Sequence, residues 1–242
     1  MDLHARCAQG IGYALFDMDG TLFDGDLGET TFLMTLVSEY LHIKPWSLTK
    51  ADILSLEASD IAAQTPALQQ YGRYAAIGDH ASAYQMTTEY LEHLSAGDIK
   101  RTAEHAFAEF TDPSTHLVIG SYQLALFVRP VPAMLSYLHA CANPVLVSAS
   151  PLSVVQAFAH LNNLAQVMII ASEGSIETLP YGEAKVRLAK ERGITRPFIA
   201  FGNSEGDTEM LNWAEVGVFR STEASPSLIE RAKAVGWTII DR

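Results

Sequence analysis

Two carboxylates separated by a single residue stand out in this sequence, in the run Asp17-Met-Asp19-Gly-Thr. They follow the apolar run Tyr13-Ala-Leu-Phe, which predicts a buried strand that ends at Asp17. Burying carboxylates there is costly unless a metal ion or a reaction uses them. One of these carboxylates could attack a phosphorus atom while the other reaches the leaving oxygen, and Mg²⁺, which prefers oxygen ligands, could lie between them. If this motif stood alone, a plain Asp-Gly turn would be the alternative.

Further polar residues follow other predicted strands or open predicted helices. Asn203 and Asp207 offer oxygen atoms that could bind the same metal ion or orient its ligands. Ser148 ends an apolar strand near a helix start, where free backbone N–H groups are typical of a phosphate cradle. Lys185 could bring a positive charge to phosphate oxygens. Taken singly, Ser148 would more often be a helix cap and Lys185 a solvated surface residue.

Alternating strand and helix patterns position these residues in the chain. The expected strands cover residues 13–17, 145–148, 167–171, 198–202, 216–219 and 238–240, and most are separated by helical patterns. This alternation predicts an α/β fold, a Rossmann-like parallel sheet with helices on both faces. Ligands bind such sheets beyond the carboxyl ends of the strands, where Asp17, Ser148 and Asn203 are expected.

Residues 24–128 have a different pattern, with apolar residues at helical spacings and no convincing strand. Helices are expected there over residues 29–42, 50–63, 67–76, 81–94 and 98–110. The pattern predicts an all-helical domain, residues 24–128, inserted into a core domain of residues 1–23 and 129–242. The insertion carries 14 acidic and 5 basic residues, against 14 and 11 in the rest of the chain, so the acidic excess is concentrated in it.

Composition and charge exclude several classes of partner. The formal net charge is −12, whereas nucleic acids and anionic membranes require a cationic face. Residues 130–172 contain no Asp, Glu, Lys or Arg, but prolines and asparagines cut this stretch into pieces too short to span a bilayer. Cys7 and Cys141 are expected to be buried small hydrophobes, which favours a reducing cytoplasm. Residues 1–12 lack the apolar stretch of a signal peptide.

Two other kinds of site find no support in the sequence. The eight histidines show no paired spacing typical of metal ligands, so ordinary surface or core positions are expected for them. Neither a Walker A sequence nor a Gly-x-Gly-x-x-Gly loop occurs, and nucleotide binding by such loops is unsupported.

The sequence resembles the haloacid dehalogenase superfamily. The four motifs of that superfamily are similar, in chain order, to Asp-x-Asp-Gly-Thr from Asp17, the strand-end Ser148, Lys185, and Gly-Asn-Ser-x-x-Asp ending at Asp207. The combination spans nearly the whole chain and is far more specific than any one motif. The insertion after the first motif resembles the C1-type cap of the phosphoserine phosphatase-like branch. Ser148-Ala-Ser-Pro is similar to the sequence of its phosphocholine phosphatase-like relatives.

The resemblance implies a phosphatase that hydrolyses a small phosphomonoester through an aspartyl-phosphate intermediate. Asp17 would be the nucleophile, and Asp19 the general acid and base. Ser148 and the Ala149 amide would hold phosphate oxygens, and Lys185 would neutralise charge on the nucleophile and the phosphoryl group.

The resemblance also implies a Mg²⁺ ion, bound by the Asp17 carboxylate, the Asp19 carbonyl oxygen and the last motif. An aspartate is usual in this branch where the chain has Asn203. An amide oxygen can ligate Mg²⁺ without charge, so weaker metal binding or a larger role for Asp207 would follow. Asp19 favours phosphoryl transfer over dehalogenation, because a dehalogenase has no leaving oxygen to protonate.

Two alternatives to a phosphatase stay open. A phosphotransferase would share every catalytic residue, and a phosphate-binding protein could have kept the fold and lost turnover. The oligomeric state is open as well.

The acidic insertion bears on the substrate. Glu29 follows Gly28 in a run that resembles a Gly-Glu pair of phosphocholine phosphatase-like sequences, and tyrosines are frequent in the insertion. Carboxylates and aromatic faces attract an ammonium group, so the expected partner is a small phosphorylated metabolite with a cationic head group. Solvated helix surface is the simpler explanation of most of this charge. Arg73 could instead bind a substrate carboxylate.

Overall fold

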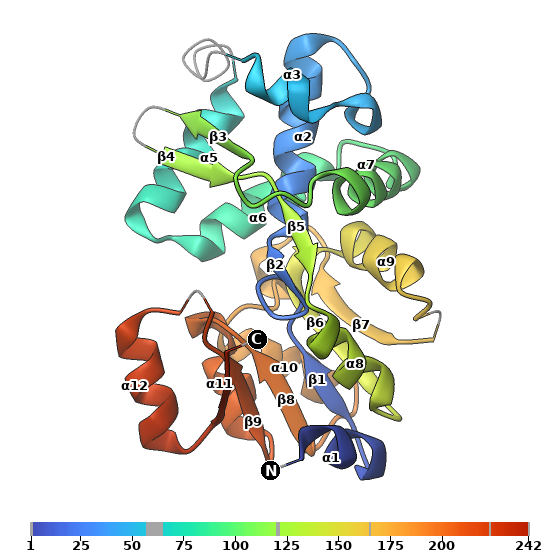
Figure 1. Ribbon diagram of the computed structural model, residues 1–242, viewed down its shortest axis with the longest axis vertical. Helices are drawn as coiled ribbons and strands as arrows, with labels where there is room; N and C mark the ends of the chain where they lie inside the picture. The colour runs from blue at the N-terminus through green and yellow to red at the C-terminus, as the bar shows by residue number, and fades with distance from the viewer. Residues whose placement is uncertain (1, 57–64, 120–121, 165, 223, 242) are drawn as a thin grey trace.

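The computed structural model describes residues 2–56, 65–119, 122–164, 166–222 and 224–241, and its centre is a six-stranded parallel sheet (Figure 1). The strands lie in the order β10-β9-β8-β1-β6-β7. Their bounds are β1 Ala14–Phe16, β6 Pro144–Pro151, β7 Met168–Ser172, β8 Ile199–Gly202, β9 Gly217–Arg220 and β10 Thr238–Ile240. The predicted α/β fold is confirmed. β1 lies inside the sheet, parallel to both β6 and β8.

Helices cover both faces of this sheet. One apolar core joins the sheet to α1 Leu3–Gln9, α8 Pro132–Ala140 and α9 Leu152–Leu161. A second core joins it to α10 Glu183–Glu191, α11 Thr208–Trp213 and α12 Pro226–Val235. Ala14 and Phe16 of β1 belong to the first core and Leu15 to the second, since successive side chains of a strand point to opposite faces. A strand buried on both faces is apolar at every position, as β1 is.

The helix α1 was not predicted from the sequence. It begins after Asp2, whose carboxylate accepts hydrogen bonds from the backbone N of His4 at 3.0 Å and of Ala5 at 3.1 Å, the geometry of an N-cap. Cys7 of α1 and Cys141 at the end of α8 are both buried and free, which confirms their predicted burial.

A pair of short strands connects the core sheet with the inserted segment, residues 24–128 (Figure 1). The chain leaves through β2 Phe23–Gly25 and returns through β5 Val128–Pro130, and the two strands pair antiparallel with Asp24 opposite Arg129. Gly25 has φ +84°, and a Cβ there would lie 2.0 Å from the carbonyl oxygen of Phe127. The close crossing of the two strands therefore requires glycine at this position.

The inserted segment is mainly helical. Its elements are α2 Leu27–Leu41, the 3₁₀ turn η1 Pro45–Ser47, α3 Lys50–Leu54, α5 Pro66–Ile77, α6 His80–Leu91 and α7 Ala96–Glu109. The helix expected over residues 50–63 ends at Leu54, and residues 57–63 lie outside the described residues. Where the core domain ends and a cap domain begins stays a prediction.

The prediction that this segment is all-helical is wrong in one respect. Strands β3 His116–Ile119 and β4 Tyr122–Ala125 form an antiparallel hairpin near the end of the segment. Neither His116-Leu-Val-Ile nor Tyr122-Gln-Leu-Ala alternates strictly between apolar and polar residues, and a short apolar run does not by itself distinguish a strand from a helix. The sequence pattern therefore missed this hairpin.

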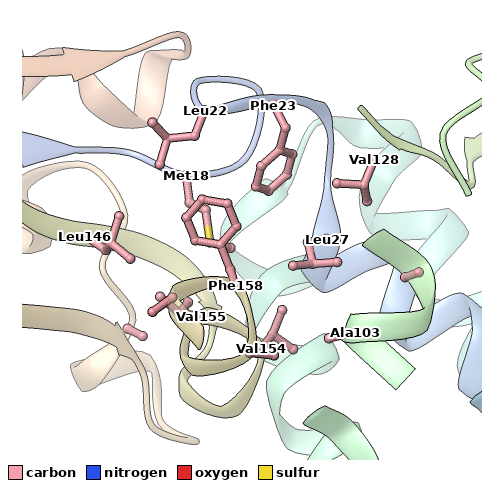
Figure 2. Packing of buried hydrophobic residues seen from close by; sticks show 14 of the residues in the cluster. Met18, Leu22, Phe23, Leu27, Ala103, Val128, Leu146, Val154, Val155 and Phe158 are labelled. Atoms are coloured by element: carbon pink, nitrogen blue, oxygen red, sulfur yellow. The ribbon is translucent and has the colours of Figure 1, made fainter. Parts of the chain in front are cut away.

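Apolar packing anchors the loop that follows β1 (Figure 2). Met18, Leu22 and Phe23 are fully buried with Leu27 of α2 and Phe158 of α9. The rings of Phe23 and Phe158 lie 5.5 Å apart between centroids. Burying a side chain of this size contributes about 1.5–3 kcal/mol. The loop that carries both candidate carboxylates is thus packed against elements of the core and of the inserted segment.

Within the described parts of the chain, none of the helices has the length and hydropathy needed to cross a bilayer.

Candidate active site

Asp17 follows β1 at the carboxyl edge of the sheet and is 7% exposed. Lys185 of α10 donates from Nζ to Asp17 Oδ1 at 2.6 Å, and Thr21 donates from Oγ1 to Asp17 Oδ2 at 2.8 Å. Burial and the charge of Asp207 raise the pKa of Asp17 to about 7, against the opposing effect of Lys185. Both carboxylate oxygens are held in place by hydrogen bonds.

Lys185 is itself buried and joins two carboxylates. Its Nζ also donates to Asp207 Oδ1 at 2.6 Å. Burial lowers the pKa of Lys185, but the ion pairs with Asp17 and Asp207 outweigh burial and raise this pKa above its ordinary value. The second oxygen of Asp207 accepts hydrogen bonds from the backbone N of Asn203 at 3.0 Å and of Ser204 at 2.9 Å. Asp207 therefore braces Lys185 and the loop after β8.

Asp19 accepts hydrogen bonds from three donors. Ser150 Oγ lies 2.7 Å and Ser148 Oγ 3.1 Å from Asp19 Oδ2, and the backbone N of Leu27 lies 2.7 Å from Oδ1. Burial and the charge of Asp26 raise the pKa of Asp19 to about 7, although these hydrogen bonds oppose the rise. A carboxyl group with such a pKa can both give and take a proton near neutral pH.

Asn203 presents its amide to the two carboxylate-bearing residues. One end of the amide lies 3.0 Å from Thr21 Oγ1 and 3.1 Å from both Asp17 Oδ2 and the Asp19 carbonyl oxygen, and hydrogen bonding favours the nitrogen at this position. A half-turn of the amide would bring its oxygen there instead, next to a carboxylate and a carbonyl oxygen. The Asp17 carboxylate, the Asp19 carbonyl and the Asn203 amide would then present three oxygen atoms, the type of ligand that Mg²⁺ prefers.

The described residues contain no group of three His, Cys, Asp or Glu side chains that could hold a metal ion. A metal ion at Asp17 would therefore depend on the Asp19 carbonyl and the Asn203 amide for its other protein ligands.

A pocket of about 360 Å³ opens over these groups and is lined by the four carboxylates of Asp17, Asp19, Asp26 and Glu29. Asp26 is the N-cap of α2 and Glu29 lies in its first turn. Burial and the charge of Glu29 raise the pKa of Asp26 to about 7. Burial likewise raises the pKa of Glu29 to about 7, although a hydrogen bond from Tyr71 opposes it. A bound cation would relieve the repulsion between these groups.

Aromatic side chains line the part of the pocket formed by the inserted segment. Tyr71 of α5 is buried and hydrogen-bonds Glu29, and Tyr84 of α6 lies 6.1 Å from Tyr181 of the core between ring centroids. The pocket is therefore bounded on one side by sheet-edge residues and on the other by helices α2, α5 and α6.

The structure brings most of the predicted site residues to one pocket. Those that line it are Asp17, Asp19, Glu29, Ala149, Lys185 and Asn203. Ser148 and Asp207 lie behind this lining, hydrogen-bonded to Asp19 and to Lys185 respectively. Arg73 is exposed on α5 and does not line the pocket. The chemical roles assigned to these residues stay predictions.

Three residues near the pocket were given no role from the sequence. Asp26 carries an N-cap signal, an aspartate just before an apolar helical run, and it accepts a hydrogen bond from the Glu29 backbone at 2.6 Å. Ser150 follows Ser148 by two residues, the spacing that puts both on one face of a strand. His80, expected at an ordinary position, lines the pocket at the start of α6.

The fold and the site define the class as an α/β protein whose pocket lies at the carboxyl edge of a parallel sheet. The chain belongs to the haloacid dehalogenase-like hydrolase family, whose family model matches residues 14–212. That match includes all four predicted motifs. The family supports a hydrolase, while the branch within the family is a separate question.

Two solved structures are similar to the chain over nearly their whole length. A protein with unknown function from Bordetella pertussis Tohama I is 18% identical, with a TM-score of 0.61 over 95% of this chain and 98% of that one. A conserved functionally unknown protein from Anaerococcus prevotii DSM 20548 is 13% identical, with a TM-score of 0.59 over 98% and 89%. At these identities the likeness concerns the fold alone. No curated protein matches the sequence.

Proposed function

We propose that this protein is a Mg²⁺-dependent phosphoric monoester hydrolase that forms an aspartyl-phosphate on Asp17. The observation that carries this proposal is the arrangement of two carboxyl groups in one pocket. Lys185 Nζ holds Asp17 Oδ1 at 2.6 Å, and Asp19, two residues later, has a pKa of about 7. Membership of a hydrolase family supports the same reaction type.

In the first half-reaction, a carboxylate oxygen of Asp17 attacks phosphorus and the bond between phosphorus and the leaving oxygen breaks. Asp19 gives its proton to that oxygen, so the product leaves as an alcohol. Lys185 keeps Asp17 oriented, and the backbone amide of Ala149, a residue that lines the pocket, would donate to phosphate oxygens.

In the second half-reaction, Asp19, now ionised, takes a proton from water. The resulting oxygen attacks phosphorus, the bond to Asp17 breaks, and inorganic phosphate is released. Bound at Asp17, the Asp19 carbonyl and Asn203, Mg²⁺ would supply positive charge that offsets the charge of the phosphate. Without such charge, a phosphate dianion would meet a pocket lined by four carboxylates.

Replacing the nucleophile tests this proposal. With Mg²⁺ and p-nitrophenyl phosphate, Asp17→Asn should lower kcat by roughly 10⁴-fold or more, because the amide has the shape of the carboxylate but cannot attack. The matched control is Asp112→Asn, which changes a partly exposed carboxylate paired with Lys50 in the inserted segment. Circular dichroism should show both variants folded.

Two outcomes would contradict the proposal. Activity of Asp17→Asn within a few-fold of the parent would remove Asp17 as the nucleophile. A parent protein that binds phosphate but releases none from any ester would favour the phosphate-binding alternative. Product analysis with added alcohols separates hydrolysis from transfer, because a phosphotransferase would give a new ester.

We further propose that the substrate carries a cationic amine or quaternary ammonium head, as phosphocholine, phosphoethanolamine and phosphoserine do. Asp26 and Glu29 place two carboxyl groups on the helical side of the pocket, beside Tyr71 and Tyr84. An ammonium group gains from carboxylates and from aromatic faces, at about 0.5–2 kcal/mol per ring. Sugar phosphates and nucleotides would leave these carboxyl groups without a cation.

Glu29→Gln tests the head-group assignment. The variant should raise KM for phosphocholine by roughly tenfold, the loss of one charge-assisted contact, while changing KM for p-nitrophenyl phosphate by less than about twofold. Glu109→Gln, which removes an exposed carboxylate from α7, should leave both values unchanged. Equal effects of Glu29→Gln on both substrates, or a metabolite screen led by sugar phosphates, would reject the assignment.

A further inference from the structure

A buried arginine lies behind the candidate site, outside the lining of the pocket. Arg220 ends β9 and is 4% exposed. Its Nη1 donates to the carbonyl oxygen of Gly20 at 2.6 Å, and its Nη2 forms an ion pair with Asp24 Oδ1. Burying a guanidinium is costly unless it is paired and hydrogen-bonded, and these contacts meet that need.

Asp24 is buried as well and forms ion pairs with two arginines. Its second oxygen accepts hydrogen bonds from Arg129 Nε at 3.0 Å and Nη2 at 2.6 Å. Burial would raise the pKa of Asp24, but the hydrogen bonds from Arg220 and Arg129 outweigh it and lower this pKa. Asp24 is therefore ionised at neutral pH. Arg129 is 55% exposed at its side chain, whereas Arg220 is enclosed.

These contacts join separate parts of the chain. Gly20 lies between Asp19 and Thr21, the residue whose hydroxyl donates to Asp17. Asp24 belongs to β2, which leads into the inserted segment, and Arg220 belongs to the core sheet. The loop closes on itself as the Gly20 backbone N donates to the carbonyl oxygen of Gly25 at 3.0 Å. Arg220 thus contacts both ends of this closed loop from the core side.

We propose that Arg220 is a positioning residue for the reaction, acting through Gly20 and Asp24 on the loop that carries Asp17 and Asp19. Met18 and Leu22 pack the apolar side of that loop (Figure 2), and Arg220 fixes its polar side. The rate consequence rests on the proposed phosphatase activity, whereas the structural consequence does not.

The kinetic test compares two arginines that hold the same carboxylate. Arg220→Met should lower kcat for p-nitrophenyl phosphate by roughly 10- to 100-fold, because small displacements of reacting groups have effects of this order. KM should change much less. Arg220→Lys, which keeps a positive charge near Asp24, should recover part of kcat. Arg129→Met removes the exposed partner and should stay within about fivefold of the parent.

Amide hydrogen exchange tests the structural part without any activity. Residues 17–25 include backbone N–H groups bonded within the loop and to the sheet, such as Asp17 N to the Phe201 carbonyl at 2.9 Å and Leu22 N to the Met18 carbonyl at 2.9 Å. Arg220→Met should speed exchange in these residues and leave β6 and β7 as in the parent. Arg129→Met should exchange like the parent over residues 17–25.

Two results would overturn the proposal. One is unchanged exchange of residues 17–25 in Arg220→Met, and the other is faster exchange throughout the sheet, which would mean a general loss of stability. If Arg220→Met does not fold, Arg220→Lys and Asp24→Asn carry the same comparison with Arg129→Met. A parent without phosphatase activity would refute the proposed function, and the exchange data would still decide the role of Arg220.

Discussion

At the scale of single residues, Asn203 can present either end of its amide to the oxygen atoms of Asp17 and Asp19. With its nitrogen toward them it donates hydrogen bonds, and with its oxygen toward them it can ligate a cation. A carboxylate at this position could do only the second, and would add a negative charge to a pocket that already has four carboxylates. An amide at this position therefore makes the pocket less repulsive, and it would lower the affinity of the proposed Mg²⁺ site.

Asn203→Asp should accordingly lower the Mg²⁺ concentration for half-maximal activity by roughly tenfold, the effect of one added charge beside the ion. Isothermal titration calorimetry with Mg²⁺ measures the same change without turnover. Asn162→Asp, at the end of α9, is a control because it adds the same charge away from the pocket. An unchanged titration in Asn203→Asp would place Asn203 outside the set of metal ligands.

At the scale of elements, the β2–β5 pair holds the inserted segment to the core through a crossing that requires glycine. Gly25→Ala would combine a left-handed φ of +84° with a Cβ 2.0 Å from the Phe127 carbonyl oxygen. Backbone strain and this overlap should lower the free energy of unfolding by about 1–3 kcal/mol. Thermal unfolding measures the change.

Gly78→Ala is the matched control for that prediction. Gly78 ends α5 with φ +71°, but a Cβ there has nothing within 4 Å. The loss of stability in Gly78→Ala should therefore reflect left-handed strain alone and be smaller than the loss in Gly25→Ala. Equal losses in both variants would show that the β2–β5 crossing adjusts to a methyl group.

At the scale of the whole molecule, the acidic pocket links stability to pH. The pKa of Asp26 and of Glu29 is about 7 in the folded protein, above the ordinary values of 3.8 and 4.5. Between about pH 4 and 7 the folded state therefore holds protons that the unfolded state releases, and the free energy of unfolding falls as pH rises through this range. Above about pH 7 both carboxyl groups ionise in the folded state as well, and the stability that their protonation contributes at lower pH is lost.

In EDTA, Glu29→Gln should raise Tm by about 2–4 °C at pH 8, the shift expected for about 1 kcal/mol in a protein of this size. At pH 5 it should change Tm little, because Glu29 is then protonated in the folded state. Differential scanning calorimetry of the parent, Glu29→Gln and the exposed control Glu109→Gln checks this. A gain at pH 5 equal to that at pH 8 would remove ionisation of Glu29 as the cause.

The sequence by itself determined the parts of the fold and site that depend on local signals. The run Tyr13-Ala-Leu-Phe-Asp17 predicted β1 and its polar end, because a strand buried on both faces is continuously apolar. Parallel strands present their carboxyl ends at one edge, so Asp17, Ser148 and Asn203 could be expected near one another before any contact was known. β3 and β4 escaped prediction because their residues neither form a continuous apolar run nor alternate strictly between apolar and polar types.

Tertiary structure alone decided which polar groups touch one another. Ser148, predicted to end its strand, lies within β6, which continues to Pro151, and Asp207 lies in the turn before α11. Ser148 hydrogen-bonds Asp19 and Asp207 hydrogen-bonds Lys185, and neither lines the pocket. Arg220 donates a hydrogen bond to the carbonyl oxygen of Gly20, which lies 200 positions earlier in the chain, and pairs with Asp24 of β2. Such contacts depend on the strand order and on how the inserted segment packs on the sheet, since hydrogen bonds form over about 3 Å whereas local periodicity fixes only which face a side chain takes.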